Sequence, residues 1–345
     1  MKEQNENPLI SFIIPAFNAS ETLIETITSI KSNSNSEILY EIIIVENGSS
    51  DDTFEIANKL SDETENIYCV KSEKGVSNAR NKGIEISRGK WIIFIDADDK
   101  LNKDSLQIVK SDINTNCDLI CYGHTINSEH LKVTQHDVVY NKNEIKSAIC
   151  MMLKEPTKYM QAWAKLFNRK VILENNIRFD NRLSYAEDSD FTFQYLLHCD
   201  SLKLSHYDIY DYSISTSSAM RSFDGKKAKQ YNIAMEKMLN YSTDDSKILK
   251  QAVYNYILIH LNIVLVREVY SKLNSASDKE KKVQMESVLA MNSFNTALKS
   301  IKFKNCLSIK MLPSLFIKLH LKFLAVIMFK LRANQNYNRE VKNNV

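Results

Sequence analysis

The chain of 345 residues is long enough for one large domain with an appendage, or for two domains. Its 44% hydrophobic and 25% charged residues are those of an ordinary globular protein, and six glycines and four prolines argue against long disordered linkers. The formal net charge of only +3 argues against a general nucleic-acid binder.

Six cysteines are scattered through the chain without a C-x-x-C pair. Cys117 and Cys121 lie close to His124, but no second ligand pair follows at zinc-finger spacing, so buried free thiols are expected here. The polar start, MKEQNENPLI, carries no signal-peptide core. Together these features predict a protein of the reducing cytosol.

Two apolar runs near the start predict buried strands, each followed by a polar turn and a helix. Residues 9–15 run into such a turn, and Ser20 with Glu21 is expected to cap the following helix. Residues 41–45 form the second strand and end in the polar turn 46–52 before another helix. The residues expected to face inward from the two helices are Leu23, Ile27 and Ile30, then Phe54, Ala57 and Leu60.

A third strand at residues 66–71 and a helix at residues 75–87 lead to a central strand, residues 91–95. This alternation of strands and helices with short connections predicts an α/β fold, a doubly wound and mostly parallel sheet. No G-x-G-x-x-G follows the first strand. Residues 83–90 resemble a P-loop, but their spacing is wrong and they precede a strand, so both phosphate motifs are rejected.

The central strand ends abruptly in Asp96-Ala97-Asp98-Asp99. Three carboxylates within four residues repel one another, so a positive charge is expected nearby. Carboxylate oxygens suit Mg²⁺ or Mn²⁺ when a diphosphate supplies the remaining ligands, and sites in open α/β sheets lie at the carboxyl ends of strands. The alternative is an acidic turn that caps the next helix.

Beyond residue 104 the pattern predicts a helix, a strand at residues 118–122, antiparallel strands within 125–140, and a closing strand at residues 207–214. The acidic stretch 187–190 opens an amphipathic helix. Trp163 offers an aromatic platform for a sugar, although a lone tryptophan is more often a core residue.

From about residue 224 onward helical periodicity dominates. Between Glu286 and Glu340 there is no acidic residue, while nine lysines and arginines stand in the same span. Within it, residues 313–331 are strongly apolar, but their longest uncharged run is too short to span a bilayer. This pattern predicts a basic amphipathic helix at an anionic membrane surface, or a core helix whose lysines reach outward.

Five motifs, IIPAFNA, IIIVENGSSDDT, GVSNARNKG, IIFIDADD and YAEDSDF, stand in this order along the chain. Their order and spacing resemble those of the inverting glycosyltransferases of family 2, which have the GT-A fold. The resemblance covers about residues 8–222, with a nucleotide half at about 8–104 and an acceptor half at about 105–222. Residues 223–345 lie outside it as a helical, basic C-terminal extension.

The resemblance implies that Phe17 stacks on the nucleotide base and that Asn47 hydrogen-bonds its edge. The family usually has Asp-Asp where this chain has Glu46-Asn47. An amide still pairs with uracil, and with cytosine when flipped, so a UDP carrier is expected and cytidine stays open. The residues implied to bind the nucleotide are Pro15, Phe17, Glu46, Asn47, Arg80, Asp96 and Ala97.

Further roles follow from the same motifs. Arg80 is expected near the nucleotide, or as a surface ion pair, and Asp96 is expected to hold the ribose. Asp98 is implied to coordinate the metal, Mn²⁺ or Mg²⁺, that bridges the two phosphates. The catalytic pair is Glu187 and Asp188, with Asp188 as the base, although the two roles could be exchanged.

The expected protein is therefore a metal-dependent, inverting sugar transferase on the inner face of the plasma membrane. Its donor is a nucleotide-sugar, and its acceptor is a growing glycan or lipid-linked glycan in capsule, O-antigen or exopolysaccharide assembly. Its partners include an anionic membrane surface and no nucleic acid. A nucleotidyltransferase would need a Gly-rich, basic loop after the first strand, which is absent. A non-catalytic scaffold is supported only by the Glu46-Asn47 departure.

Overall fold

The structure, a computed structural model, describes residues 7–33, 38–214, 223–242 and 246–342. The chain divides into two compact units: Met1–Ala148 with Thr157–Ser215, and Ile149–Pro156 with Thr216–Val345. The domain boundary expected between residues 222 and 223 adjoins residues 215–222, which lie outside the described ranges. The polar stretch 31–37, which is expected to be a loop, lies partly outside them as well. The division of residues 8–222 into two halves stays a prediction.

A mixed sheet of ten strands forms the first unit. Its order is β3-β2-β1-β4-β9-β6-β10-β5, with β7 paired to β6 and β8 paired to β10. Strands β1 to β4 are mutually parallel, β9 runs antiparallel between β4 and β6, and β6 is parallel to β10. The strands are Ile10–Ala16 (β1), Tyr40–Glu46 (β2), Ile67–Lys71 (β3), Trp91–Phe94 (β4), Lys100–Leu101 (β5), Leu119–Ile126 (β6), Glu129–Leu131 (β7), Val138–Tyr140 (β8), Lys165–Asn168 (β9) and Leu202–Asp211 (β10).

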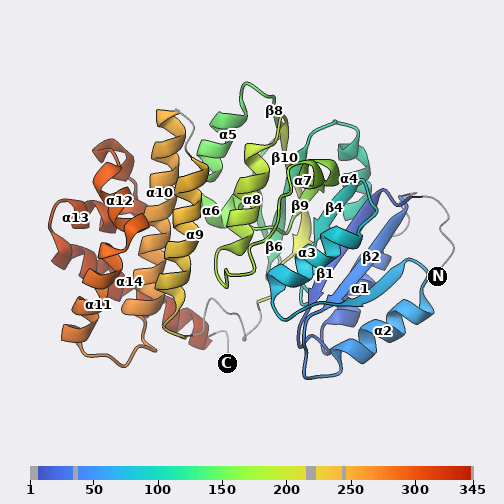
Figure 1. The fold of residues 1–345 in the computed structure, drawn as a ribbon, viewed down its shortest axis with the longest axis horizontal. Helices are drawn as coiled ribbons and strands as arrows, with labels where there is room; N and C mark the ends of the chain where they lie inside the picture. Colours follow the sequence, from blue (N-terminus) through green and yellow to red (C-terminus); the bar gives the residue numbers. More distant parts are fainter. Residues whose placement is uncertain (1–6, 34–37, 215–222, 243–245, 343–345) are drawn as a thin grey trace. The chain divides into compact units, whose positions relative to one another are not determined.

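Helices alternate with these strands, and Figure 1 shows α3 lying across the sheet beside β1 and β2. This confirms the predicted α/β class with a mostly parallel, doubly wound sheet. Antiparallel strands, β7 and β8, lie within residues 125–140, as expected. The first eight helices are Leu23–Lys31 (α1), Thr53–Glu63 (α2), Val76–Ile86 (α3), Ser105–Ile113 (α4), Ile145–Met152 (α5), Pro156–Tyr159 (α6), Arg169–Glu174 (α7) and Glu187–Leu197 (α8).

Both faces of the central strands are covered, which is why their sequences are continuously apolar. Phe12 and Ile14 of β1 belong to the same buried cluster as Ile27 of α1. On the other face, Ile13 lies against Gly83 of α3, where an added Cβ would fall 2.3 Å from Cγ2 of Ile13. Only glycine therefore lets α3 approach β1 this closely.

Two local predictions in this unit are wrong. Ser20 and Glu21 do not cap α1, whose N-cap is Thr22 without a side-chain hydrogen bond. Instead, the backbone N–H of Ser20 donates to Asp51 in the neighbouring turn, so a tertiary contact takes the place of a cap. The last strand begins at Leu202, before the expected start at residue 207, because its first half pairs with β6 and β8.

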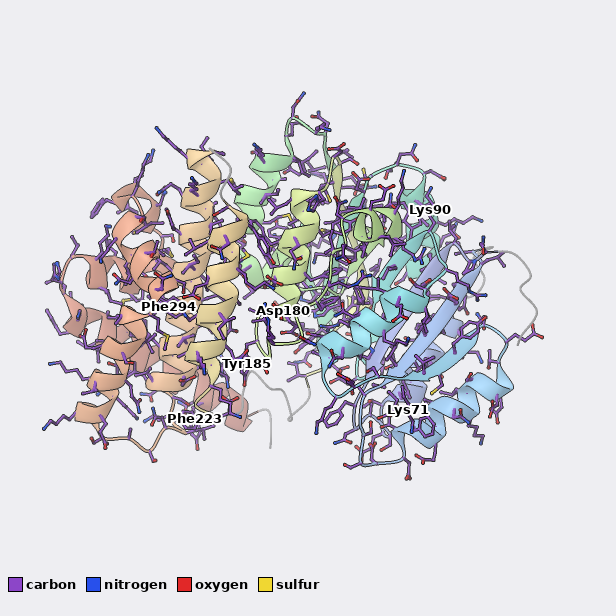
Figure 2. The ribbon with its side chains drawn as sticks, in the orientation of Figure 1. Lys71, Lys90, Asp180, Tyr185, Phe223 and Phe294 are labelled. Atoms are coloured by element: carbon purple, nitrogen blue, oxygen red, sulfur yellow. The ribbon has the colours of Figure 1, made fainter. Side chains whose placement is uncertain are left out.

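The second unit is helical, as expected. Its buried face on α10 includes Val253, Ile257, Leu261 and Val264, which confirms the predicted periodicity. Phe294 of α12 is fully buried within it (Figure 2). Its elements are Lys227–Tyr241 (α9), Lys247–Val264 (α10), Leu265–Val269 (η1), Asp278–Ala290 (α11), Asn292–Ser300 (α12), Phe303–Cys306 (η2), Ile309–Met311 (η3), Leu312–Lys318 (α13) and Lys322–Lys342 (α14).

The apolar stretch at residues 313–331 is not one helix. It forms α13 and the first half of α14, separated at His320, which adopts a left-handed backbone with φ of 62°. One helical run among the described residues, Lys247–Val269, is long and apolar enough to cross a membrane, and 61% of its apolar window is buried inside the unit. A core helix of a globular protein has the same property, so this finding is weak evidence for a span.

Candidate active site

The parallel strands bring their carboxyl ends to one edge of the sheet. Ala16 of β1 is paired with Glu46 of β2, and Glu46 is paired with Lys71 of β3. Lys71 is marked in Figure 2. On the other side of β1, Ile95 donates from its backbone to Ile13, which places Asp96 at the same edge. The motifs quoted from the sequence are therefore neighbours in space.

Side chains connect the turn after β1 to the turn after β2. Oδ1 of Asn18 accepts the backbone N–H of Ser50 at 2.8 Å. Asp51 accepts the backbone N–H of Ser20 at 3.0 Å and is bonded to Thr53. Burial would raise the pKa of Asp51, but the hydrogen bonds from Thr53 and Ser20 lower it to about 2. These contacts hold the two turns in a fixed mutual position.

Asn47 is the residue of this edge whose side chain most clearly lacks a partner. It is only 3% exposed, and its Oδ1 is buried with no hydrogen-bond partner among the described residues. An unpaired buried carbonyl costs about 1–3 kcal/mol, so such an atom is expected to meet a donor from a ligand. Its position matches the base-edge role that the resemblance implies.

Glu46 has a different task from its neighbour. Its Oε1 accepts the backbone N–H groups of Gly48, at 2.7 Å, and Ser49. Burial acts to raise the pKa of Glu46, but these hydrogen bonds outweigh it and lower the pKa. The carboxylate therefore shapes the turn that presents Asn47.

Phe17 is 44% exposed, as a ring that stacks on a base must be. Nζ of Lys74 lies 4.9 Å from the centroid of this ring. The stem of Lys74 also approaches Gly48, where an added Cβ would lie 3.7 Å from its Cβ. Lys74 is thus a cation at the nucleotide edge that sequence reasoning missed; its place just before the GVSNARNKG motif is the only signal. Pro15 is buried in β1, opposite Val45.

Arg80 joins the central strand to α8. It is 3% exposed, and its Nη2 donates to Oδ1 of Asp96 at 2.9 Å, while its Nη1 donates to Oδ1 of Asp188. The same Nη1 lies 3.6 Å from Oε1 of Glu187. Burial acts to lower the pKa of Arg80, but the three carboxylates raise it, so the guanidinium stays charged. The structure thus supplies the positive charge that the acidic turn led us to expect.

A special backbone conformation places the two acidic residues of α8. Ala186, the N-cap, is left-handed with φ of 62°, and Glu187 and Asp188 are the first two residues of the helix. Oδ2 of Asp188 accepts the backbone N–H of Ala162 at 3.3 Å. Asp188 keeps 21% of its side chain exposed, so it is both anchored and accessible. Figure 2 marks Asp180 and Tyr185 on the segment that leads into this helix.

The Asp96–Asp99 turn is held by β10. The backbone N–H of Asp96 donates to the hydroxyl of Tyr210 at 3.1 Å, and that hydroxyl donates to Asp99 at 2.6 Å. Asp99 also accepts the backbone N–H of Ser213, so it supports the turn from behind. The carbonyl of Ala97 accepts hydrogen bonds from the hydroxyls of Thr22, the N-cap of α1, and Thr26, within α1; Ala97 and Thr26 are both buried.

Arg80 faces three carboxylates, those of Asp96, Glu187 and Asp188, and two more, Asp98 and Asp99, stand in the turn after β4. Burial, then Asp96, raises the pKa of Asp99 to about 8. Burial, then Asp188, raises the pKa of Glu187 to about 7, against the influence of Arg80. A divalent cation would favour the ionised form of these carboxyls, and their hard oxygen donors suit Mg²⁺ or Mn²⁺. No three metal-binding side chains converge among the described residues, so Asp98 would need a ligand's oxygens to complete a metal site.

Aromatic and cationic side chains lie beside this cluster. Trp163 stacks on Tyr210 with ring centroids 4.8 Å apart and on Tyr212 at 5.5 Å. His124, on β6, contacts its edge, and Nδ1 of His124 is buried without a partner among the described residues. Burial, together with Lys165, lowers the pKa of His124 to about 4. A neutral imidazole thus faces the tryptophan.

Lys165 is a second residue that sequence reasoning missed. It begins β9, is only 1% exposed, and makes no ion pair with a described residue. Burial lowers its pKa, while Cys121 and Asp188 act in the opposite direction. A lysine inside the apolar run MQAWAKLF was the available signal, because an uncompensated buried cation is costly and often functional.

The chain is similar in sequence to known glycosyltransferases. The family model described as "Glycosyl transferase family 2" matches residues 11–175. The chain is 25% identical to the uncharacterized glycosyltransferase EpsJ of Bacillus subtilis (strain 168) over 309 residues, covering 86% of this chain and 88% of that protein. It is 26% identical to the poly(ribitol-phosphate) beta-N-acetylglucosaminyltransferase TarP of Staphylococcus aureus (strain N315) over 205 residues, 58% of this chain and 62% of that one.

A solved structure shares the fold. The crystal structure of S. aureus TarS residues 1–349 in complex with UDP-GlcNAc aligns with a TM-score of 0.63 and 17% sequence identity, covering 96% of this chain and 91% of that chain. The mixed sheet and the helical extension described above therefore constitute the GT-A fold with C-terminal helices.

Proposed function

Because this chain is a member of glycosyltransferase family 2 through residues 11–175, we propose that it is an inverting sugar transferase that uses a UDP-sugar donor. The acceptor is a hydroxyl of a growing glycan in bacterial polysaccharide assembly. One observation carries the proposal: Arg80 holds Asp96, at the end of the central strand, and Asp188, at the start of α8, on a single guanidinium. Asp96, which is proposed to bind the donor, and Asp188, the proposed base, therefore lie on either side of Arg80 at the edge of the sheet.

The nucleotide lies along the carboxyl edge. The base stacks on Phe17, and its N3–H donates to Oδ1 of Asn47, which lacks a partner within the described part of the chain. Glu46 shapes the intervening turn, and Pro15 and Ala97 line the edge as backbone. Asp96 binds the ribose, and its hydrogen bond to Arg80 orients it for this role.

The transfer step uses Asp188 as the base. Its carboxylate takes the proton of the acceptor hydroxyl as that oxygen attacks the anomeric carbon, and the bond from this carbon to the diphosphate oxygen breaks on the opposite side. Configuration at the anomeric carbon is therefore inverted. Glu187, whose pKa is raised to about 7, binds an acceptor hydroxyl beside the base, and Trp163 supplies a platform for the acceptor sugar.

A Mn²⁺ or Mg²⁺ ion would be held by Asp98 together with oxygens of the diphosphate, and would stabilise the charge that grows on the leaving nucleotide. The carboxyl groups around Arg80 and in the turn after β4 are the observation that supports this assignment. The chain's own contribution is to orient Asp98 through the turn that Asp99 and Tyr210 support.

We place the enzyme at the inner face of the plasma membrane. Support comes from α14, where Phe323, Ile327 and Leu331 recur at helical spacing and are 63%, 52% and 57% exposed. Such a stripe with basic neighbours is typical of helices that lie in an anionic interface. A lipid-linked glycan acceptor would suit this location.

The test is a thermal-shift panel of UDP, CDP, GDP and dTDP with and without Mn²⁺, followed by hydrolysis of UDP-sugars. A ligand that binds only the folded state raises the melting temperature. We expect a Mn²⁺-dependent shift with UDP that Asp98→Ala removes, and turnover that Asp188→Asn lowers by about 10²–10⁴-fold while UDP binding persists. Asp200→Asn, which changes an exposed carboxylate, is the control and should behave as wild type.

Nucleotide binding without any turnover in the presence of donors and metal would support the scaffold instead. No shift with any nucleotide would exclude the donor site proposed here.

A further inference from the structure

The C-terminal unit contains a cavity of about 200 Å³ at the N-terminal end of α10. Its walls come from the first turns of α10, from the segment around η2, and from Cys150 and Lys154. This volume is several times the share of about 30 Å³ that one water takes in the liquid, so the cavity admits a phosphate-sized group. The lysines that line it are Lys154, Lys247, Lys302 and Lys304.

These four lysines make no ion pair with a described residue, and no described acidic residue lines the cavity. Other lysines of the unit differ. Lys322 is bonded to Glu286, and Lys330 is bonded to Asp278, both on α11. Part of the positive charge of the C-terminal segment is thus neutralised within the unit, whereas the four lysines at the cavity have no acidic partner among the described residues. Residues 243–245, which precede α10, lie outside the described ranges.

Amide side chains hold the wall of the cavity in place. Oε1 of Gln251 accepts the backbone N–H of Lys302 at 2.9 Å and the side-chain amide of Asn305 at 3.1 Å. Nε2 of Gln251 donates to the carbonyl of Ser300 at 3.1 Å. Asn255, one turn further along α10, donates to the carbonyl of Asn305. The lysines therefore project from a braced wall.

Large apolar side chains stand exposed beside the same lysines. Ile248, which follows Lys247 and lines the cavity, is 74% exposed, and Phe303, between Lys302 and Lys304, is 53% exposed. Leu307 is 59% exposed just beyond η2. Monomeric proteins rarely leave such residues grouped in water, and grouped apolar and basic side chains suit the boundary between lipid headgroups and acyl chains.

We propose that this cavity binds the phosphate group of an anionic phospholipid and docks the C-terminal unit on a membrane surface, with Ile248, Phe303 and Leu307 entering the headgroup layer. The inference rests on the membrane location proposed above and adds to it a lipid headgroup site away from α14. The lysines, which have no ion pair with a described residue, supply the positive charge that a phosphodiester requires, and the apolar neighbours favour a bilayer over a free phosphate.

The test is sedimentation of the full chain with vesicles of phosphatidylcholine alone, or with about one third phosphatidylglycerol, at low salt. We expect binding to the anionic vesicles to exceed binding to neutral ones by at least about ten-fold. One lysine near an anionic surface contributes about five-fold to the affinity. The double substitution Lys302→Gln with Lys304→Gln should therefore lower the affinity for anionic vesicles about 25-fold. Phe303→Ser with Leu307→Ser should also weaken binding.

The matched control is Lys279→Gln with Lys282→Gln, which removes the same charge from exposed positions of α11. The affinity of this control variant for anionic vesicles should fall by less than about three-fold. Hydrolysis of UDP-sugar without vesicles should be unchanged in every variant, because none alters the proposed active site. If the wild-type protein hydrolyses no UDP-sugar, the proposed function is contradicted. The vesicle-binding result tests the lipid site independently of that outcome.

The proposal is overturned if the control pair loses as much binding as the cavity pair, since general charge would then explain recruitment. It is also overturned if only Phe323→Ser with Ile327→Ser on α14 abolishes binding. Lysine-dependent binding of glycerol phosphate without recruitment to vesicles would assign a free phosphate as the ligand. Cavity-dependent self-association without vesicle binding would assign the surface to a second copy of the chain.

Discussion

Arg80 and Asp188 are 108 positions apart in the chain, yet Nη1 of Arg80 donates directly to Oδ1 of Asp188. The other terminal nitrogen of the guanidinium donates to Asp96, which ends the central strand. One buried cation thus joins the donor edge of the sheet to the helix that carries the proposed base.

Replacing this cation is expected to damage both stability and activity. Arg80→Gln leaves Asp96, Asp188 and Glu187 without their partner, and removing one member of a buried ion pair costs about 3–5 kcal/mol. Urea unfolding at neutral pH measures this loss. Arg182→Gln, which removes an exposed arginine paired with Asp180, should cost less than about 1 kcal/mol. Equal losses in the two variants would contradict a central role for Arg80.

Asn47 should matter for nucleotide binding and not for folding. Its buried Oδ1 has no partner among the described residues, so Asn47→Leu should leave the free energy of unfolding unchanged or raise it. The same change should weaken UDP binding about 5- to 100-fold, as measured by calorimetry, because an acceptor for the base is lost. Asn47→Asp keeps an acceptor and should retain UDP.

A structural role for Asn47 would give the opposite pattern. Asn47→Leu would then lower the free energy of unfolding by more than about 1 kcal/mol, with UDP affinity changed only in proportion to the unfolded fraction.

Because the pKa of Glu187 is raised in the folded state, we expect the stability of the metal-free protein to depend on pH. Its pKa rises from 4.5 to about 7 on folding, chiefly through burial, so the folded state binds this proton more tightly than the unfolded state. Stability contributed by protonated Glu187 is present below about pH 4.5 and is lost as the pH rises to about 7, by at most roughly 3 kcal/mol.

Denaturant titrations at several pH values test this sign. Glu187→Gln mimics the protonated form, so the variant should gain stability over wild type above about pH 7 and match it near pH 4.5. An advantage for wild type at the higher pH would contradict burial as the dominant influence on Glu187.

Replacing Lys165 is expected to stabilise the protein and to change the pH dependence of its activity. Lys165→Met keeps the length of the side chain and removes a buried charge without an ion pair, so the free energy of unfolding should rise by about 1 kcal/mol or more. The acidic limb of the pH–rate profile should move to higher pH, because the active site loses a nearby positive charge. Stability that rises while this limb stays fixed would restrict Lys165 to a structural role.

Much of the fold followed from local pattern. Residues 91–95 predicted a buried strand because every position is apolar, and β4 is covered on both faces. The acidic turn 96–99 was a candidate because an apolar strand ends there in three carboxylates, whereas the role of Asp188 was implied by the resemblance to family 2. Features of this kind depend on consecutive residues, so they can be predicted from the sequence.

Other features were beyond a local pattern. The break at His320 was missed because nothing in the composition of residues 313–331 separates one helix from two. Lys74 and Lys165 were missed because their surroundings come from distant segments. The expected role of Ser20 and Glu21 failed for a related reason, since Asp51, from the neighbouring turn, took the Ser20 amide.

The sequence by itself determined the class of the sheet, the order of its motifs and the residue types at its carboxyl edge, because burial and turn chemistry act over neighbouring residues. The tertiary structure alone decided that Arg80 bonds Asp188, that Oδ1 of Asn47 has no partner among the described residues, and that four lysines from separate segments share one cavity. These relations depend on the order of the strands and the packing of helices, which bring together residues that no local pattern connects.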